Sequence, residues 1–416
     1  MKELKVMYRG YGANVEIGTL AEDGNDVLFQ YSPAAIAQRL ELSPVRLPLR
    51  TLAYPDQQQH LVNIHRVPGL LYDSLPDSWG FRLMNRRMKA RGIEFDATST
   101  LDRLAYLGEN TMGALTYTPG TGELSDTKDL TLVELASEVQ ALLTDDSHEL
   151  LDEVARTGSS PGGARPKAMV WFNPESGKMS TQAEQVAGAE PWLIKFPAKE
   201  DEPDSCALEE LYARIAHQCN MGMTDTRFFE LSNGLTAFGT KRFDRQDGQR
   251  VHVHSLAGLL HINFQIPSVG YEDFFKATRR LTRDNRELKK AIQRCVYNVL
   301  MNNRDDHSKN LSFLLDREGN WRLAPPYDLT YCQGYMSEHF MDVGSEGKNP
   351  GRAHIVKAAQ GAGMSPKDTE AIIDQMLDCA TDKAFKTFGK GLPIRAKTLT
   401  AVAKIIDANR TRLARK

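Results

Sequence analysis

The chain has 416 residues, of which 41% are hydrophobic, 25% charged and 8% aromatic. These values are typical of a globular protein and exclude a disordered chain, a collagen-like chain and a small disulfide-stabilised domain. The 52 basic residues nearly balance the 54 acidic ones, and the net charge of -2 argues against a globally basic nucleic-acid-binding protein. At roughly 150 residues per domain, the length predicts two or three domains.

Cysteine usage and hydropathy indicate in which cellular compartment the protein is expected. An odd number of cysteines without a C-x-x-C pair predicts reduced, mostly buried thiols rather than a disulfide framework or a zinc ribbon. The five are Cys206, Cys219, Cys295, Cys332 and Cys379. The N-terminus alternates apolar and polar residues as strands do, and no run of about 18 apolar residues occurs. We therefore expect a soluble, cytoplasmic protein with no membrane segment.

The first third of the chain is expected to contain strands and one basic helix. Short strand-like pieces separated by Gly, Asn and Pro occupy residues 1–55. Pro76 and Asp77 then precede a predicted helix that turns Trp79 and Leu83 inward and a row of arginines outward. This basic face is interpreted as solvated, and a nucleic-acid or partner contact is the alternative.

The rest of the chain becomes increasingly helical. Thr131 and Glu134 form a capping box that begins a helix, and strands are predicted at 168–172 and 192–196. Apolar residues from 288 to 300 recur at helical spacing without a miss, which predicts a buried helix. A hairpin over 311–324 and further helices from about 366 to the C-terminus follow.

The polar sequence NRDDHSKN lies between the buried helix and the hairpin. Asp305 and Asn310 are five residues apart, and Asp328 follows Asn310 by 18 residues, after the hairpin. Protein kinases space a catalytic aspartate and two Mg²⁺ ligands in this way. The pattern predicts Asp305 as the catalytic residue and Asn310 and Asp328 as metal ligands, because Mg²⁺ prefers oxygen donors. A transition-metal cluster of Asp305, Asp306 and His307, or a solvated helix-end cap, is the alternative.

Two features N-terminal to that sequence are candidates for binding phosphates. Lys195 is a cation within an apolar strand, which suits either a phosphate-binding lysine or an edge residue; Glu209 or Glu210 on the next helix is its possible partner. The segment 158–167 is rich in glycine, which lets backbone N–H groups approach phosphate oxygens, although a plain surface turn would have the same composition. Its candidate ATP-binding residues are Gly162, Gly163, Ala164, Arg165 and Lys167.

In this order of motifs the chain resembles the HipA family of serine/threonine kinases, the toxins of bacterial toxin–antitoxin pairs. The resemblance covers nearly the whole chain and rests on NRDDHSKN with PPYDL, KRFDR, SSPGGARPK with WLIKFP, and LPDSWG. It implies an α+β, two-lobed protein-kinase-like fold, with a sheet-rich N-terminal lobe that carries an extra N-terminal subdomain and a mainly helical C-terminal lobe. The expected segments are 1–125 for the subdomain, 126–245 for the ATP-binding part and 246–416 for the helical lobe.

The same resemblance implies cofactors, regulation and partners. ATP and Mg²⁺ are the expected cofactors, and His307 is expected near ATP or as a residue that positions the loop. Autophosphorylation is expected at Ser160 or its neighbour Ser159 and would inactivate the protein. The loop departs from the commoner family pattern G-x-Q-x-K, because Ala164-Arg165-Pro166-Lys167 stands there. Expected partners are a dimeric HipB-like helix-turn-helix antitoxin, operator DNA bound through it, and a protein substrate such as an aminoacyl-tRNA synthetase or another translation component.

Two other functions remain open at this point. A small-molecule kinase of the aminoglycoside or choline type uses the same Asp…Asn…Asp spacing, although KRFDR and the N-terminal segment have no place in that pattern. A DNA-bound corepressor with little catalysis is the third possibility, and the intact set of Asp305, Asn310, Asp328 and Lys195 argues against it.

Overall fold

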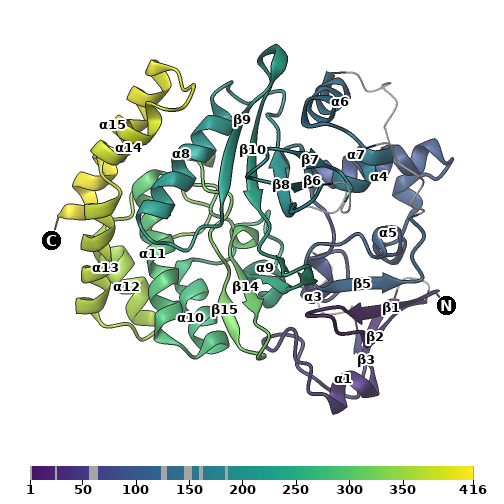
Figure 1. Ribbon diagram of the computed structural model, residues 1–416. Coiled ribbons are helices and arrows are strands. Elements are labelled where there is room, and N and C mark those ends of the chain that lie inside the picture. The colour runs from purple at the N-terminus through teal and green to yellow at the C-terminus, as the bar shows by residue number, and fades with distance from the viewer. Residues whose placement is uncertain are drawn as a thin grey trace. The chain divides into compact units, whose positions relative to one another are not determined.

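A computed structural model describes residues 2–23, 26–55, 64–122, 129–144, 152–158, 163–182 and 186–415. The chain divides into two compact units (Figure 1). Unit 1 comprises Met1–Glu202, Thr226–His254 and Gly258–Ile262, and unit 2 comprises Pro203–Asp225, Ser255–Ala257 and Asn263–Lys416. The predicted boundary at residue 125 lies outside the described residues, so the finer division into three segments stays a prediction.

The first sheet of unit 1 is antiparallel, with strand order β4-β3-β2-β1-β5. Its strands are β1 (Lys2–Tyr8), β2 (Val15–Asp23), β3 (Asp26–Tyr31), β4 (Tyr54–Pro55) and β5 (Leu115–Thr118). Alternate residues of β1 are buried, namely Leu4, Val6 and Tyr8, because successive side chains of a strand point to opposite faces. The helices α1 (Pro33–Ala37), α3 (Gly69–Tyr72) and α5 (Thr100–Leu107) lie in the same part of the chain. The strands predicted over residues 1–55 are thus confirmed.

The second sheet of unit 1 has the order β7-β6-β8-β10-β9 and is also antiparallel. Its strands are β6 (Lys167–Phe172), β7 (Met179–Ser180), β8 (Glu190–Lys195), β9 (Thr226–Glu230) and β10 (Thr236–Lys241). β6 and β8 are the two strands predicted from sequence. The central position of β8 shows that Lys195 is not an edge residue, because β8 is bonded on both sides.

Helices α4 (Ser78–Ala90) and α6 (Leu132–Thr144) pack against this second sheet, and α7 (Asp152–Gly158) lies beside them (Figure 1). Trp79 and Leu83 of α4 are buried in one cluster with Trp192 of β8, as the predicted inward face requires. The basic face of α4 is partly engaged within the chain, since Arg82 and Arg86 donate to the carbonyl oxygen of Leu142 at 2.9 and 3.2 Å.

The predicted capping box of α6 is confirmed as well. The Glu134 carboxylate accepts from the Thr131 N–H at 2.8 Å, and the Thr131 hydroxyl accepts from the Glu134 N–H at 3.3 Å.

The KRFDR sequence forms a buried charge cluster in unit 1. The carboxylate of Asp244 accepts from Arg242 at 2.8 Å, from Arg245 at 2.7 Å and from the Gly113 N–H at 2.8 Å. Burial alone would raise the pKa of Asp244, but the two guanidinium groups outweigh it and hold that pKa well below its usual range. The cluster lies beside β11 (Arg245–Gln246) and β12 (Gln249–Arg250) and ties them to the residues that precede β5. This motif therefore has a structural role.

Unit 2 is mainly helical, which together with the sheet-rich unit 1 confirms the predicted α+β composition. Its helices are α8 (Ser205–Gln218), α10 (Tyr271–Thr282), α11 (Asn285–Met301), α12 (Arg352–Gly361), α13 (Pro366–Cys379), α14 (Asp382–Gly389) and α15 (Ala396–Ala414). The predicted hairpin is present as β14 (Ser312–Leu315) and β15 (Trp321–Leu323). Residues of β13 (His252–Ser255) and α9 (Leu256–Leu260) are divided between the two units.

Helix α11 is the core of unit 2 and packs against α10, α12, α13 and α15 (Figure 1). Its apolar residues are buried as their spacing predicts, from Leu288 to Leu300. The carboxylate of Asp284 caps its first turn by accepting from the Arg286 N–H at 2.8 Å. It ends at Asn302, whose φ of 55° is left-handed, a conformation that asparagine tolerates better than most residues.

The prediction that all cysteines are reduced is wrong for one pair. Cys219, at the end of α8, and Cys379, at the end of α13, form a disulfide across 160 residues of sequence. No local spacing could reveal this pair, because only the packing of the helices brings the two Cα atoms to 5.4 Å. Cys206, Cys295 and Cys332 are free thiols.

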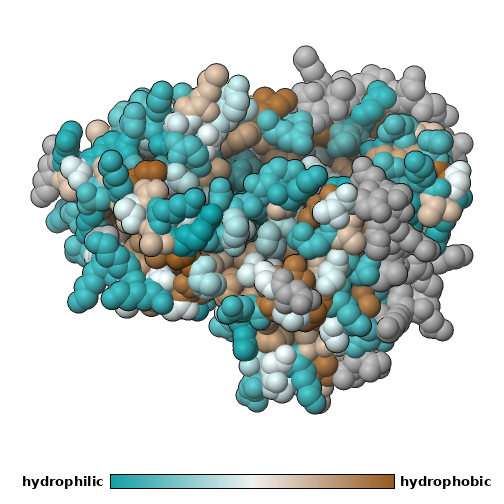
Figure 2. Space-filling view, turned by 90° about the horizontal axis from the view of Figure 1, so that it is seen from above, coloured by the Kyte–Doolittle hydropathy of each residue, from teal (hydrophilic) through white to brown (hydrophobic). Residues whose placement is uncertain are grey.

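The surface carries few large apolar side chains. Hydrophilic residues dominate the face seen in Figure 2, and hydrophobic residues form small separate groups on it. Within the described ranges the exposed large hydrophobic residues are Leu28, Leu52, Ile93, Ile266, Tyr335 and Met336. None of the helices in the described part of the chain is long and apolar enough to cross a membrane.

Candidate active site

The NRDDHSKN loop is bonded to the segment that carries Asp328. Asn302 donates from its side chain to the carbonyl oxygen of Cys332 at 3.0 Å, and Asn303 donates to the carbonyl oxygen of Asp328 at 3.4 Å. Asn303 also donates to the side chain of Asn298 on α11 at 3.1 Å, so the loop is anchored to the core helix. The structure thus brings the backbone of Asp328 to the loop of Asp305.

The three residues predicted from the kinase spacing differ in environment. The Asp305 side chain is 56% exposed, so its carboxylate can be reached from solvent. Asn310 donates from Nδ2 to the carbonyl oxygen of Asp305 at 2.9 Å, so the amide has its oxygen left for a cation. Asp328 has a left-handed φ of 56°, a conformation that a non-glycine residue rarely adopts and that is enriched at functional sites. An amide oxygen and a carboxylate fit a Mg²⁺ site.

Asp306 has a role that the sequence did not reveal. Its side chain is fully buried and accepts from the Tyr271 hydroxyl at 2.8 Å, from His339 Nδ1 at 2.8 Å and from the Phe340 N–H at 2.9 Å. Burial, and next the Asp306 carboxylate, raise the pKa of the Tyr271 hydroxyl well above its usual value. Asp306 therefore holds the loop in place, and the doubled aspartate was its only signal in the sequence.

His307 packs between two aromatic rings. Its ring centroid lies 4.9 Å from that of Phe264 and 5.8 Å from that of Phe340, and Nε2 lies 4.0 Å from an oxygen of Asp305. This packing fits the expectation that His307 positions the loop, and its contact with ATP stays a prediction. The alternative of a transition-metal cluster is not supported, since the described residues contain no group of three His, Cys, Asp or Glu side chains that could hold a metal.

Two lysines face each other in the second sheet of unit 1. Lys195 of β8 is directly opposite Lys167 of β6, and both are buried, with exposed fractions of 6% and 4%. Directly opposed residues on antiparallel strands project to the same face, so the two ammonium groups share one side of the sheet. The sequence proposed both residues separately but did not show that they are neighbours.

The described end of the glycine-rich loop lies against Lys167. Gly163 has a φ of 100°, which favours glycine, and its Cα lies close to the Lys167 ammonium group. The Gly163 N–H donates to the carboxylate of Asp77, from the LPDSWG sequence. This anchor between loop and helix start was not predicted, because the two residues are far apart in sequence.

The other predicted loop residues have mixed outcomes. Ala164 is exposed, and the Arg165 guanidinium pairs with Asp201 at 3.0 Å. Ser159, Ser160 and Gly162 lie outside the described residues.

The two predicted partners of Lys195 belong to unit 2. Glu209 and Glu210 of α8 are both buried, at 3% exposure each. Glu210 accepts from Arg214 at 2.7 Å, which gives it a partner on its own helix. Pairing of Lys195 with either glutamate stays a prediction.

Comparisons with known proteins agree with this description. A model of the HipA-like C-terminal domain matches residues 159–384, and a model of the HipA N-terminal domain matches residues 6–118. A protein of Haemophilus influenzae described as "Putative kinase" is 25% identical over 158 residues, which are 35% of this chain and 46% of that protein. The match thus spans about half the length of that relative.

Among solved structures, HipA of Shewanella oneidensis, in a toxin–antitoxin complex with HipB and operator DNA, covers 99% of this chain. The match extends over 97% of that chain, with a TM-score of 0.74 and 16% identity, so it shows a common fold. The proinflammatory kinase CtkA of Helicobacter pylori covers 55% of this chain and 89% of its own, with a TM-score of 0.42 and 14% identity. The C-terminal domain model alone matches more than half of the residues of this chain, and the chain therefore belongs to the HipA family.

Proposed function

We propose that this protein is an ATP- and Mg²⁺-dependent protein serine/threonine kinase that acts as the toxin of a toxin–antitoxin pair. The observation that carries the proposal is the opposed pair of buried lysines, Lys167 and Lys195. Both side chains project to the same face of the sheet, and the Lys167 ammonium group lies against Gly163. Two cations and a glycine-rich backbone on one face suit a polyanion such as the triphosphate of ATP.

The loop of unit 2 supplies the groups for phosphoryl transfer. Asp305 would orient the acceptor hydroxyl and take its proton, while Asn310 and Asp328 would hold Mg²⁺. When bound, the metal neutralises charge on the phosphates. Asp306 and His307 keep the backbone of this loop fixed, so that the exposed carboxylate of Asp305 is presented in one position.

A strained turn supports a protein acceptor over a small molecule. Gly334, Met336 and Ser337 all have left-handed φ values, of 70°, 51° and 59°, which cost about 1–2 kcal/mol for each non-glycine residue. The turn displays Tyr335 and Met336, which are 85% and 70% exposed. A polar metabolite would gain little from contact with two adjacent exposed apolar side chains, whereas a polypeptide can pack against them.

This turn is attached to the catalytic loop. The guanidinium of Arg304, the neighbour of Asp305, donates to the carbonyl oxygen of Ser337 and, at 3.1 Å, to that of Lys348. The Gln333 side chain donates to the Ser337 hydroxyl at 2.9 Å. A polypeptide that contacts Tyr335 would therefore lie near the carboxylate that orients its hydroxyl group.

Family membership supports the biological role. The Shewanella HipA was solved with HipB and operator DNA, so we propose a small, dimeric HipB-like antitoxin as the partner of this chain. DNA would be bound through the antitoxin, because a net charge of -2 gives this chain little attraction to phosphates. An aminoacyl-tRNA synthetase or another translation component is the proposed substrate, and Ser160 or Ser159 the proposed site of inactivating autophosphorylation.

Labelled ATP and Mg²⁺ test the proposal directly. The protein is incubated with and without a bacterial lysate, alongside Asp305→Asn and the matched control Asp407→Asn, an exposed aspartate of α15. We expect label on serine or threonine of a protein, lost in Asp305→Asn and retained in Asp407→Asn. Label on a metabolite alone would favour the small-molecule kinase, and no label at all would favour the corepressor.

A further inference from the structure

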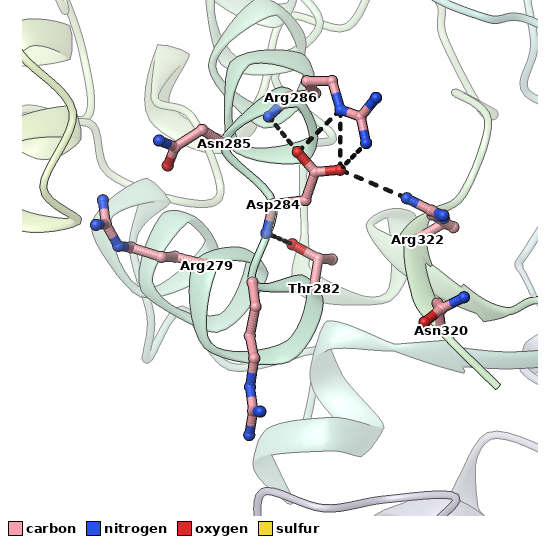
Figure 3. A pocket seen from close by; sticks show the side chains of 8 residues that line it. Arg279, Thr282, Asp284, Asn285, Arg286, Asn320 and Arg322 are labelled. Atoms are coloured by element: carbon pink, nitrogen blue, oxygen red, sulfur yellow. Dashed lines mark hydrogen bonds and ion pairs between the residues drawn. The ribbon is translucent and has the colours of Figure 1, made fainter.

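Unit 2 contains a hollow of about 710 Å³ at the junction of α10 and α11, where the β14–β15 hairpin also contributes (Figure 3). The proposed function makes no use of it. Eight residues line it: Arg279, Thr282, Arg283, Asp284, Asn285, Arg286, Asn320 and Arg322. Asp316, outside the lining, also pairs with Arg322, so four guanidinium groups are accompanied by two carboxylates and an excess of two positive charges remains.

The single carboxylate serves to orient two of the arginines. Asp284 accepts from Arg286 through Nε at 3.0 Å and Nη2 at 2.8 Å, and it lies 3.5 Å from Nη1 of Arg322 (Figure 3). Arg322 is also held from the other side by Asp316 at 3.3 Å. Asp284 thus links the two head groups, and each keeps further N–H donors beyond those used in these contacts.

The other two arginines complete the lining. Arg279 is fixed by donating from Nη1 to the carbonyl oxygens of Ala362 and Gly363, at 3.0 Å each. Arg283 sits in the turn between the helices with a left-handed φ of 53°, and its side chain makes no hydrogen bond or ion pair within the described part of the chain. Three arginines therefore already have partners within the chain, whereas Arg283 can turn its side chain toward a ligand.

The lining also restricts what the ligand can be. It contains no aromatic and no aliphatic residue, so it offers neither an aromatic ring on which a base could stack nor an apolar surface. Guanidinium groups bind phosphate and carboxylate through paired N–H donors, and several arginines that line one hollow favour a ligand with more than one anionic group. The N-terminus of α11, a helix of 17 residues, adds a partial positive charge on the same side.

We propose that this hollow is a binding site for adjacent phosphate groups. The source is either a small oligophosphate or the backbone of a nucleic acid, since both present phosphates at close spacing without requiring contact with a base. The inference does not depend on the proposed kinase activity, because none of its residues belongs to the catalytic loop or to the lysine pair.

The test measures binding of tripolyphosphate by calorimetry in Mg²⁺-free buffer at about 150 mM salt, where weak surface attraction is largely screened. The variants are Arg283→Gln, which removes a side chain without partners, and the double variant Arg283→Gln/Arg322→Gln. The matched control is Arg280→Gln, an exposed arginine of α10 that does not line the hollow. Thermal unfolding of each variant confirms that the fold is kept.

We expect saturable binding that weakens about tenfold in Arg283→Gln and further in the double variant, with little change in Arg280→Gln. A Lys195→Met background must leave this binding in place, since otherwise it belongs to the proposed nucleotide site. A 12-nucleotide single strand identifies the source: tighter binding of tripolyphosphate indicates an oligophosphate, and tighter binding of the strand indicates a nucleic acid. Equal losses in Arg280→Gln and Arg283→Gln, equally tight binding of citrate, or no saturable binding would each overturn the proposal.

Discussion

Replacement of Asp306 by alanine should loosen the loop 303–310, whereas replacement of the neighbouring Asp305 should not. Asp306 is completely buried and accepts three hydrogen bonds, from Tyr271, His339 and the backbone of Phe340. Each bond to a charged acceptor contributes roughly 1.5–3 kcal/mol, and the losses are not additive because water can enter the space. Removal of one partner from a buried charged network costs about 3–5 kcal/mol in all, and we expect a loss of this size.

Asparagine should not rescue this position. Oδ1 of Asp306 accepts from Phe340, and Oδ2 accepts from both Tyr271 and His339. With its oxygen toward Phe340, an amide would place its NH₂ group against Tyr271 and His339, which would then have to accept instead of donate; in the other orientation the NH₂ group would meet the Phe340 N–H. Asp306→Asn should therefore also destabilise the loop, by less than the alanine variant.

Hydrogen exchange followed by mass spectrometry is the suitable assay, because a chain of two units need not unfold in one step. Peptides that contain Tyr271, the loop 303–310 and Phe340 should exchange more than about a hundredfold faster in Asp306→Ala, the equivalent of about 3 kcal/mol. Asp305→Ala is the matched control: its side chain is 56% exposed, so its cost should stay within about 0.5 kcal/mol. Wild-type exchange in Asp306→Ala, or an equal change in both variants, would refute the assigned role.

Three further outcomes are expected. Lys167→Ala should weaken ATP binding about tenfold or more in calorimetry, while Lys178→Ala, on the exposed turn of the same sheet, should not; equal affinities would remove Lys167 from the phosphate site. The Asp244 pKa is lowered in the folded state, so its stabilising contribution is present above the unfolded pKa of about 4 and is lost as the pH falls through the folded value. The melting temperatures of wild type and Asp244→Asn should thus differ most near pH 7 and converge in acid, and a constant difference would contradict this. Tyr335→Ser/Met336→Ser should raise KM for a protein substrate without changing ATP affinity, whereas Ile266→Ser, another exposed apolar residue of unit 2, should leave both unchanged.

The sequence by itself determined the elements whose signals are local. The period of apolar residues defined α11, the capping box defined the start of α6, and the alternation of short apolar pieces defined the strands. The spacing of Asp305, Asn310 and Asp328 required only that a hairpin separate a loop from a carboxylate, and the hairpin is present. These patterns can be recognised in the sequence because each depends only on residues within one or two helical turns or within one strand.

Only the tertiary structure decided which distant residues meet. Lys167 and Lys195 are opposed through strand register, Asp77 anchors Gly163 across 86 residues, and the partners of Asp306 lie 33 to 35 residues away. The Cys219–Cys379 disulfide, which the odd cysteine count argued against, spans 160 residues. The arginines of the hollow likewise come from two helices and a hairpin. All these contacts share one physical reason. Strand register and helix packing are set by the summed burial of many side chains, which cannot be read from any single residue or spacing.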